Sequence, residues 1–421
     1  MIKLLVIADD FTGALDTGVQ FSEKGIEIRV IVDDGKANSR LNISETGTIQ
    51  VLVIDAETRH MKPDDAYQKV FSIVREAGEA NIPYIYKKTD SALRGNIGSE
   101  LSALLEASGE KVLPFLPAFP QMRRITKNGI HYIDRLPVSE SVFGRDPFEP
   151  VLRDSVKEII CLQSSVHVSE IKNESQIPWE ETGIWVFDSM ENEDLEHAAK
   201  LLKEKKVSRI MAGCAGFASM LPEMLELEGI KTEHEMLEQN LLVVCGSVNP
   251  ITRRQLEYGE CCGYHRICLS AVEKLEPGYW TTQKGINTIR QFKKICDTNS
   301  CCILDSNDAG KQKETLDYAY QHHLSTEQMR CRISRTMGVI VKKMMDEGVK
   351  AVLLITGGDT LLGFMEEIEH WELKPISEIS PGCVLTKIAY RNSEYHIITK
   401  SGGFGDERLL ENIIKKIKKV S

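Results

Sequence analysis

The sequence predicts an α/β protein made of two α/β domains, with mostly parallel sheets and a ligand cleft between the domains. Short apolar segments alternate with amphipathic helical segments almost from end to end, which is the pattern of a parallel sheet covered by helices on both faces. The chain has 421 residues, more than one hydrophobic core usually serves. A charged stretch without strand signals, from Glu223 to Asn240, separates two such alternating series. We therefore expect domains at residues 1–230 and 240–421.

The elements of the first domain follow from apolar runs and helical spacing. Helices are expected at residues 16–25, 63–81 and 193–206. Strands are expected at residues 2–8, 26–32, 48–56, 83–89, 112–119, 183–188 and 207–213. Residues 119–155 are polar and basic and lack periodicity, so we expect an ordered binding loop there, with a small hairpin near residues 129–134.

The second domain repeats the alternation. Helices are expected at residues 250–260, 281–296 and 325–348. Strands are expected at residues 241–247, 265–270, 301–306, 351–359 and 394–403. The segment of about 180 residues lies within the usual size range of one domain.

The composition excludes several classes of function. The longest apolar runs stay far below the roughly 20 residues of a membrane helix, and the N-terminus lacks the features of a secretion signal. A net charge of −10 argues against nucleic acid as a partner. The eleven cysteines follow no metal-binding spacing, which favours reduced thiols in the cytoplasm. We expect a cytoplasmic protein that binds small molecules, with no nucleic-acid or membrane partner; a homodimer remains open.

The first strand runs into a cluster of acids. Asp9, Asp10, Thr12, Gly13 and Asp16 fall within eight positions, at the strand end where parallel sheets bind their ligands. A structural alternative is that Asp10 or Thr12 caps a helix while Gly13 allows a tight turn. A helix cap requires one such residue, and three acids favour a ligand or catalytic role.

Basic residues follow two further strands. Arg59 follows the third strand, and an Arg fork can bind a carboxylate bidentately. Neighbouring lysines on a strand face opposite sides, so one of Lys87 and Lys88 is expected in the ligand site, the other being solvated or paired with an acid. A surface ion pair is the alternative for each cation. The fourth strand end carries Lys87, Lys88, Thr89, Asp90 and Arg94.

The second domain has glycine-rich turns between strands and helices. Glycine lets the backbone approach a phosphate, and helix N-termini offer unpaired amides to it. Tight strand-to-helix turns also need glycine for steric reasons alone. None of these turns is a Walker A loop or a dinucleotide-binding GxGxxG. The turns contain Gly246-Ser247, Gly357-Gly358-Asp359-Thr360 and Gly402-Gly403 with Gly405.

Taken together, these motifs resemble the four-carbon acid sugar kinase family. The segments that carry the resemblance, in chain order, are ADDFTGALDTGVQF, DAETR, KKTDSALRGNIGSEL, FLPAFPQMRRITKNGIHYIDRLPVSESVFGRDP, GSVNPITRRQLE, TGGDT and SGGFGDERLL. The resemblance implies an ATP-dependent kinase of the terminal (4-) hydroxyl of D-threonate, D-erythronate or a 3-oxo-tetronate. It places the sugar acid on the N-terminal domain and ATP on the C-terminal domain. This chain has the turn GSVN in place of the GSCS form of oxo-tetronate and erythronate kinases. In this turn it is more similar to D-threonate kinases.

The resemblance, with the positions of the strand ends, implies roles for these residues. Asp10 and Asp90 are the candidates for the catalytic carboxylate that accepts the proton of the attacking hydroxyl. Arg59 and one lysine would hold the sugar carboxylate, and Mg²⁺ would accompany ATP at ligands that the sequence does not identify. Substrate contacts are expected at Asp9, Asp10, Arg59, Lys87, Lys88, Thr89, Asp90 and Arg94. Nucleotide contacts are expected at Ser247, Gly357, Gly358, Asp359, Thr360, Gly402 and Gly403.

Two rival functions remain at this stage. A dehydrogenase or isomerase of sugar acids would need a nicotinamide site, and the missing GxGxxG counts against it. A sensor that binds a sugar acid without catalysis would leave the glycine-rich turns of the second domain unexplained. A sugar-acid kinase is therefore the preferred hypothesis.

Overall fold

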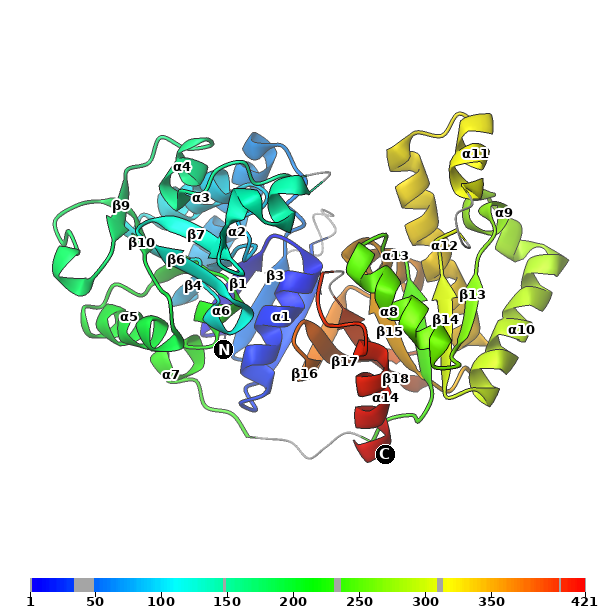
Figure 1. Ribbon diagram of the computed structural model, residues 1–421. Coiled ribbons are helices and arrows are strands. Elements are labelled where there is room, and N and C mark those ends of the chain that lie inside the picture. Colours follow the sequence, from blue (N-terminus) through cyan, green and yellow to red (C-terminus); the bar gives the residue numbers. More distant parts are fainter. Residues whose placement is uncertain are drawn as a thin grey trace. The chain divides into compact units, whose positions relative to one another are not determined.

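The structure, a computed structural model, describes residues 2–33, 49–146, 149–230, 236–308, 313–400 and 403–420. The chain divides into two units, Met1–Lys231 and Thr232–Ser421 (Figure 1). Each unit contains a mostly parallel sheet with helices between its strands. The predicted fold class of two α/β units is confirmed.

The first unit, unit 1, alternates strands and helices as the apolar periodicity predicts. The elements before the predicted loop are β1 (Leu4–Ala8), α1 (Phe11–Ser22), β2 (Ile28–Val32), β3 (Val51–Asp55), α2 (Pro63–Glu79), β4 (Tyr84–Lys88), α3 (Ile97–Ser108) and β5 (Val112–Leu116). Those after it are α4 (Val156–Cys161), β9 (Val168–Ile171), β10 (Gly183–Phe187), α5 (Asn192–Glu204), β11 (Ile210–Gly213), α6 (Ala215–Ala218) and α7 (Leu221–Met224). The short strand β9 was not predicted.

The sheet of unit 1 is parallel, with strand order β2-β3-β1-β4-β11-β5-β10-β9. Helices α2, α3 and α4 contribute to one hydrophobic core with its strands, and Figure 1 shows α1, α5 and α7 on the other side of this sheet. Central strands covered on both faces must be apolar throughout, which explains the continuous burial of β1 and β3. The carboxyl ends of β1, β3 and β4 are neighbours, because Ala8 is in register with both Asp55 and Lys88.

The predicted binding loop at residues 119–155 forms a small antiparallel sheet, here called the insertion sheet. Its strands are β6 (Arg124–Lys127), β7 (Ile130–Ile133) and β8 (Leu136–Pro137). The predicted hairpin is confirmed, since β6 and β7 are joined by the Asn128-Gly129 turn. Short 3₁₀ helices occupy Pro120–Met122, Val138–Glu140 and Val142–Arg145.

The strands described in the second unit, unit 2, follow the order β13-β14-β12-β15-β18-β17-β16. Its first five strands are mutually parallel, while β16 and β17 pair in antiparallel fashion. The elements up to the last crossover are β12 (Leu241–Cys245), α8 (Pro250–Cys261), β13 (His265–Cys268), α9 (Ala271–Leu275), α10 (Gln283–Thr298), β14 (Cys301–Asp305), α11 (Glu314–Gln321) and α12 (Thr326–Asp346). The others are β15 (Val352–Thr356), α13 (Gly358–Ile368), β16 (Glu372–Ser380), β17 (Cys383–Tyr390), β18 (Ser393–Lys400) and α14 (Leu409–Val420).

The antiparallel strands β16 and β17 were not predicted. Exposed and half-buried residues interrupt β16, and its pairing with β17 contains two register shifts. Such strands lack the continuous apolar run that identifies a strand buried on both faces. Among the described residues, no helix is both long and apolar enough to cross a membrane.

Candidate active site

The end of strand β1 places two acids at the start of helix α1. Asp10 is the N-cap of α1: its Oδ1 accepts a hydrogen bond from the Gly13 amide (3.0 Å), and its Oδ2 accepts one from the Thr12 hydroxyl (2.7 Å). Asp9 is 2% exposed, and its Oδ1 has no hydrogen-bond partner among the described residues. The structural alternative is therefore correct for Asp10 as a cap, but capping leaves the buried Asp9 unexplained.

Arg59 connects three acids that come from two strand ends, Asp9 and Asp10 after β1 and Asp90 after β4. Its Nε and Nη2 each lie 2.7 Å from Asp9 Oδ2, and its Nη1 lies 2.7 Å from Asp10 Oδ2. A longer contact of 3.6 Å joins Nη2 to Asp90 Oδ1. Burial alone would lower the pKa of Arg59, but the three carboxylates hold it well above its ordinary value. The guanidinium thus fixes the orientation of the acids, and its contact with a sugar carboxylate stays a prediction.

Asp90 is saturated with donors from its own loop. The Arg94 guanidinium binds it bidentately, with Nε 2.9 Å from Oδ2 and Nη2 3.0 Å from Oδ1. The amides of Ala92 and Arg94 also donate to Oδ2, each at 3.2 Å. Burial would raise the pKa of Asp90, yet Arg94 and Arg59 hold it well below its ordinary value. Leu93 adopts a left-handed φ of 63° within this loop, a strained conformation of the kind that clusters at functional sites.

The two adjacent lysines turn to opposite sides, as predicted from strand alternation. Lys87 is fully buried, forms an ion pair with Glu100 of α3 (3.1 Å) and donates to the Lys88 carbonyl (2.8 Å). Lys88 is 4% exposed and lies on the Asp10 side, because a Cβ added to Gly13 would come within 2.8 Å of its Nζ. Lys88 therefore lies beside Asp10, whereas Lys87 is held in an ion pair with Glu100.

Asp10 and Asp90 differ in how open they are to a ligand. The side chain of Asp10 is 20% exposed, whereas that of Asp90 is 8% exposed. Burial raises the pKa of Asp10, but the charges of Arg59 and Lys88 outweigh burial and lower it. Asp10 is thus an ionised, partly accessible carboxylate, the state that a proton acceptor requires.

The insertion sheet contributes residues that sequence reasoning missed. Arg124 is 8% exposed, and its guanidinium contacts the Ser91 hydroxyl next to Asp90. Two guanidinium groups lie against the Phe143 ring, that of Arg94 at 5.0 Å and that of Arg124 at 5.3 Å from its centroid. The basic composition of residues 119–155 indicated a binding role for this segment. Because the segment lacks periodicity, the sequence did not predict the direction of the Arg124 side chain.

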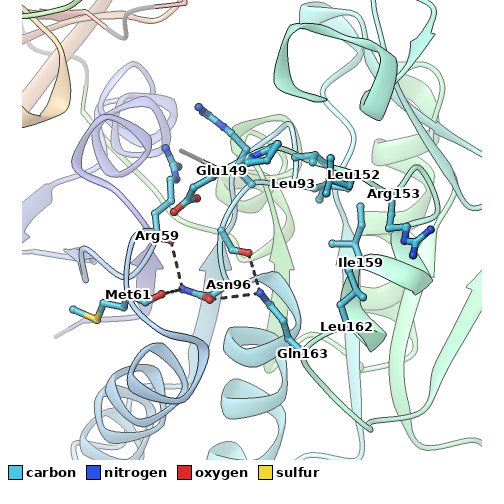
Figure 2. A pocket seen from close by; sticks show the side chains of 14 residues that line it. Arg59, Met61, Leu93, Asn96, Glu149, Leu152, Arg153, Ile159, Leu162 and Gln163 are labelled. Atoms are coloured by element: carbon cyan, nitrogen blue, oxygen red, sulfur yellow. Dashed lines mark hydrogen bonds between the residues drawn. The ribbon is translucent and has the colours of Figure 1, made fainter. Parts of the chain in front are cut away.

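A pocket of about 240 Å³ adjoins the charged cluster of Asp9, Asp10, Arg59, Asp90 and Arg94 (Figure 2). Arg59 and Arg94 lie on its wall, and Leu152 and Leu162 line its apolar part. Asn96 on its floor donates to the carbonyls of Thr58 (2.8 Å) and Met61 (2.9 Å). These hydrogen bonds hold the loop that contains Arg59 against the start of α3 and so help to fix the position of Arg59.

The predicted nucleotide residues of unit 2 gather at one edge of its sheet. Cys245 and Thr356 are in register, so the turns that contain Ser247 and Gly357–Thr360 follow neighbouring strand ends. Gly357 has a φ of 101°, which favours glycine. A side chain at Gly246 would overlap the Thr360 hydroxyl of α13, so these two turns pack directly on each other.

The remaining nucleotide residues differ in their surroundings. The Ser247 hydroxyl accepts a hydrogen bond from the Asn249 amide at 3.2 Å. Asp359 is 53% exposed and lies 3.5 Å from Arg330 of α12. Gly403 has open space where a Cβ would project, and Gly402 lies outside the described residues. Among the described residues, no cluster of three or more His, Cys, Asp or Glu side chains has metal-site geometry.

Two known domain families match the chain, one within unit 1 and one within unit 2. Residues 4–221 match a family described as "Sugar-binding N-terminal domain". Residues 242–410 match a family described as "Nucleotide-binding C-terminal domain".

Three characterised relatives cover nearly the whole chain. A D-threonate kinase of Salmonella typhimurium LT2 is 29% identical over 426 residues, covering 97% of each chain. A D-erythronate kinase of Heliobacterium modesticaldum is 24% identical, covering 96% of this chain and 95% of the relative. A 3-oxo-tetronate kinase of Haemophilus influenzae is also 24% identical, covering 96% and 98%.

Solved structures share the fold. A Salmonella typhimurium LT2 protein described as a putative tRNA synthase superposes with a TM-score of 0.78 at 20% identity, covering 98% of both chains. A Haemophilus influenzae protein of a DUF1537 family superposes with a TM-score of 0.71 at 20% identity, covering 98% of this chain and 100% of that one. At this level of identity the superpositions speak for the fold alone.

Proposed function

The chain belongs to the four-carbon acid sugar kinase family, and from this premise we propose that it phosphorylates the terminal (4-) hydroxyl of D-threonate with ATP. The full-length match to a D-threonate kinase, at 29% identity over 97% of both chains, carries this choice of substrate. D-Erythronate and 3-oxo-tetronates are the alternative substrates, because full-length relatives with those names are 24% identical.

The sugar acid is proposed to bind at the charged cluster of unit 1. Lys88 provides a buried positive charge for the sugar carboxylate, since its side chain lies beside Asp10 and is 4% exposed. Asp9, with its unpartnered Oδ1, accepts a hydrogen bond from a sugar hydroxyl. Thr89 has a buried hydroxyl without a partner among the described residues and can contribute in the same way.

Asp10 is proposed as the proton acceptor of the reaction. Its carboxylate is ionised at neutral pH, partly exposed and held in one orientation by Arg59 and Thr12. Both oxygens of each carboxylate accept hydrogen bonds, but the Asp90 side chain is 8% exposed against 20% for Asp10. Arg94 also binds Asp90 bidentately, so the proposed role of Asp90 is to position Arg94 and Arg59. The lone pair that accepts the 4-hydroxyl proton is therefore assigned to Asp10.

ATP is proposed to bind at the glycine-rich turns of unit 2. The amides after β12 and β15, around Ser247 and Gly357–Gly358, can approach the phosphates closely. When bound with ATP, Mg²⁺ would supply positive charge that offsets the charge of the phosphates. Asp359, an exposed carboxylate at the start of α13, offers the hard oxygen ligand that this ion prefers.

A substrate panel tests the proposal. Purified protein with Mg-ATP is given D-threonate, D-erythronate and 3-oxo-tetronates in parallel, and ADP release is followed while ³¹P NMR locates the phosphate on the product. We expect ADP release with D-threonate and a phosphate on O4. A higher kcat/KM with another four-carbon acid would overturn the choice of substrate. The lack of sugar-acid-dependent ADP release with every acid would overturn the kinase proposal.

A further inference from the structure

Three parallel strands of unit 2 end, and the antiparallel β17 begins, in one row of side chains. Cys245 of β12 is in register with Thr356 of β15, Thr356 with Lys400 of β18, and Lys400 with Cys383 of β17. Residues in register on neighbouring strands point to the same face of a sheet. The Gly357 amide donates to the Lys400 carbonyl at 3.2 Å, so this row continues directly into the glycine turn before α13.

Lys400 brings an ammonium group into the interior at this row. The residue is 1% exposed, and its Nζ donates to the Thr252 hydroxyl at 3.2 Å. Thr252 lies in the first turn of α8, whose N-cap Asn249 accepts a hydrogen bond from the Ile251 amide at 2.9 Å. The charge of Lys400 is therefore placed at the start of the helix that follows the Ser247 turn.

A second, independent feature of the row points to a ligand. Thr356 is 1% exposed, and its Oγ1 has no hydrogen-bond partner among the described residues. It stands between Cys245 and Lys400 on the same face. A buried hydroxyl without a partner is unfavourable, so a hydrogen bond from a ligand would stabilise this position.

The charges around Lys400 are consistent with an anionic ligand. The pKa of Lys400 is lowered to about 8. Burial lowers it, and the nearby thiols of Cys383 on β17 and Cys245 on β12 offset part of that effect. The hydroxyl that it meets on α8, from Thr252, carries no charge. Asp305 and Arg266 of the next two strands face the Cys245 thiol. A phosphate next to this ammonium would favour its charged form.

We propose that Lys400 binds the phosphates of the nucleotide in unit 2, with the Thr356 hydroxyl as a neighbouring contact. This assignment rests on the proposed function, because it takes ATP as the ligand. It adds a charged side chain to turns that otherwise offer backbone amides, and a lysine ammonium is a compact charge suited to phosphate. It also explains why a lysine, rather than an apolar residue, ends a buried strand.

Titration calorimetry with ATP and adenosine tests the assignment. We expect Lys400→Met to weaken ATP binding at least tenfold and to leave adenosine binding unchanged, because adenosine has no phosphates. Lys415→Met, at an exposed lysine of α14, is the matched control and should bind ATP normally. Unchanged ATP binding in Lys400→Met, or an equal loss for adenosine, would overturn the assignment.

Thermal unfolding separates a binding role from a structural one. Without nucleotide, Lys400→Met should unfold at the same or a higher temperature than the wild type, since it removes a buried charge. With ATP, its stabilisation should be smaller than that of the wild type. A lower Tm without nucleotide together with full stabilisation by ATP would show a structural role and overturn the assignment.

Proton uptake at pH 8 provides a test with a folded, charged variant. Because a group with a pKa of about 8 is half ionised at this pH, ATP binding should draw in up to about half a proton per wild-type molecule. Lys400→Arg, which stays charged, should take up none, as measured by calorimetry in two buffers of different ionisation enthalpy. Equal uptake by both proteins would contradict the assignment. If the wild type itself fails to bind ATP, the proposed function fails instead.

Discussion

Asp10 and Arg59 are 49 positions apart in the sequence, and their side chains meet at 2.7 Å between Oδ2 and Nη1. The acid belongs to the cap of α1 and the guanidinium to the loop after β3, so the parallel register of β1 and β3 brings them together. The contact keeps an accessible carboxylate ionised and in one orientation. In the proposed reaction Arg59 orients the site and Asp10 accepts the proton.

Replacing Arg59 should impair use of the sugar acid. Arg59→Ala leaves Asp9, Asp10 and Asp90 without their shared countercharge, and we expect kcat/KM for the sugar acid to fall by about ten- to a hundredfold or more. Loss of one partner of a buried ion pair also costs about 3–5 kcal/mol of stability, measurable by urea unfolding. ATP affinity without sugar should stay near normal. Arg123→Ala, at a side chain that is 82% exposed, is the control. Loss of ATP binding alone would contradict the placement of the sugar acid on unit 1.

The two candidate bases should separate in single-turnover experiments. Asp10→Asn removes the proton acceptor but keeps the size of the cap, so the chemical step should slow by about 10²- to 10⁴-fold at saturating substrates. Asp90→Asn should raise KM and lower stability more than it slows chemistry, because Asp90 binds Arg94 and backbone amides. Rapid quench at saturating ATP and sugar acid measures the step directly. If Asp10→Asn leaves the rate intact, the proton acceptor is another group.

The paired lysines should give opposite phenotypes. Lys88→Met should reduce kcat/KM for the sugar acid at least tenfold with little change in stability. Lys87→Met should destabilise the protein, because it leaves Glu100 buried without its countercharge. The double variant Lys87→Met with Glu100→Gln should recover much of that stability, which chemical denaturation can measure. Equal catalytic loss in both single variants would show that the assignment of the two faces is wrong.

His131 should make unit 1 sensitive to mild acid. Burial lowers the pKa of His131 from 6.5 to about 4, and its neighbour Arg124 adds to this effect. Below pH 6.5 the unfolded chain binds a proton that the folded chain does not bind until about pH 4. The histidine thus reduces stability as the pH falls through this window, by about 2 kcal/mol at pH 5. Urea unfolding at pH 7.5 and 5 should show a smaller difference for His131→Asn than for the wild type. His167→Asn, at a side chain that is 59% exposed, should keep the wild-type difference.

The sequence was a good guide to residues at strand ends. Asp9, Asp10, Lys88 and Asp90 follow apolar strands whose parallel pairing was predictable, and such strands end at a common edge. The same rule could have identified Lys400, which lies near the end of a predicted strand and is the last residue of β18. Alternation along β4 predicted that Lys87 and Lys88 would diverge.

Other features depend on contacts that no local pattern encodes. The saturation of Arg59 by three carboxylates follows from the convergence of three loops. Glu100 was missed because an acid inside a helix usually faces solvent, and its burial reflects the lysine opposite it. The direction of the Arg124 side chain depends on the insertion sheet, whose short strands show no clear hydrophobic periodicity in the sequence.

The bare backbone at Gly13 has a practical consequence. A methyl group there would come within 2.5 Å of Asp10 Oδ1 and 2.8 Å of Lys88 Nζ, so both side chains would have to leave their present positions. Alanine also suits a helix better than glycine. We therefore expect Gly13→Ala to fold with every ionisable group present but with Asp10 displaced from Arg59 and Thr12, so crystallographers could use it to trap the unreacted substrates of the proposed reaction.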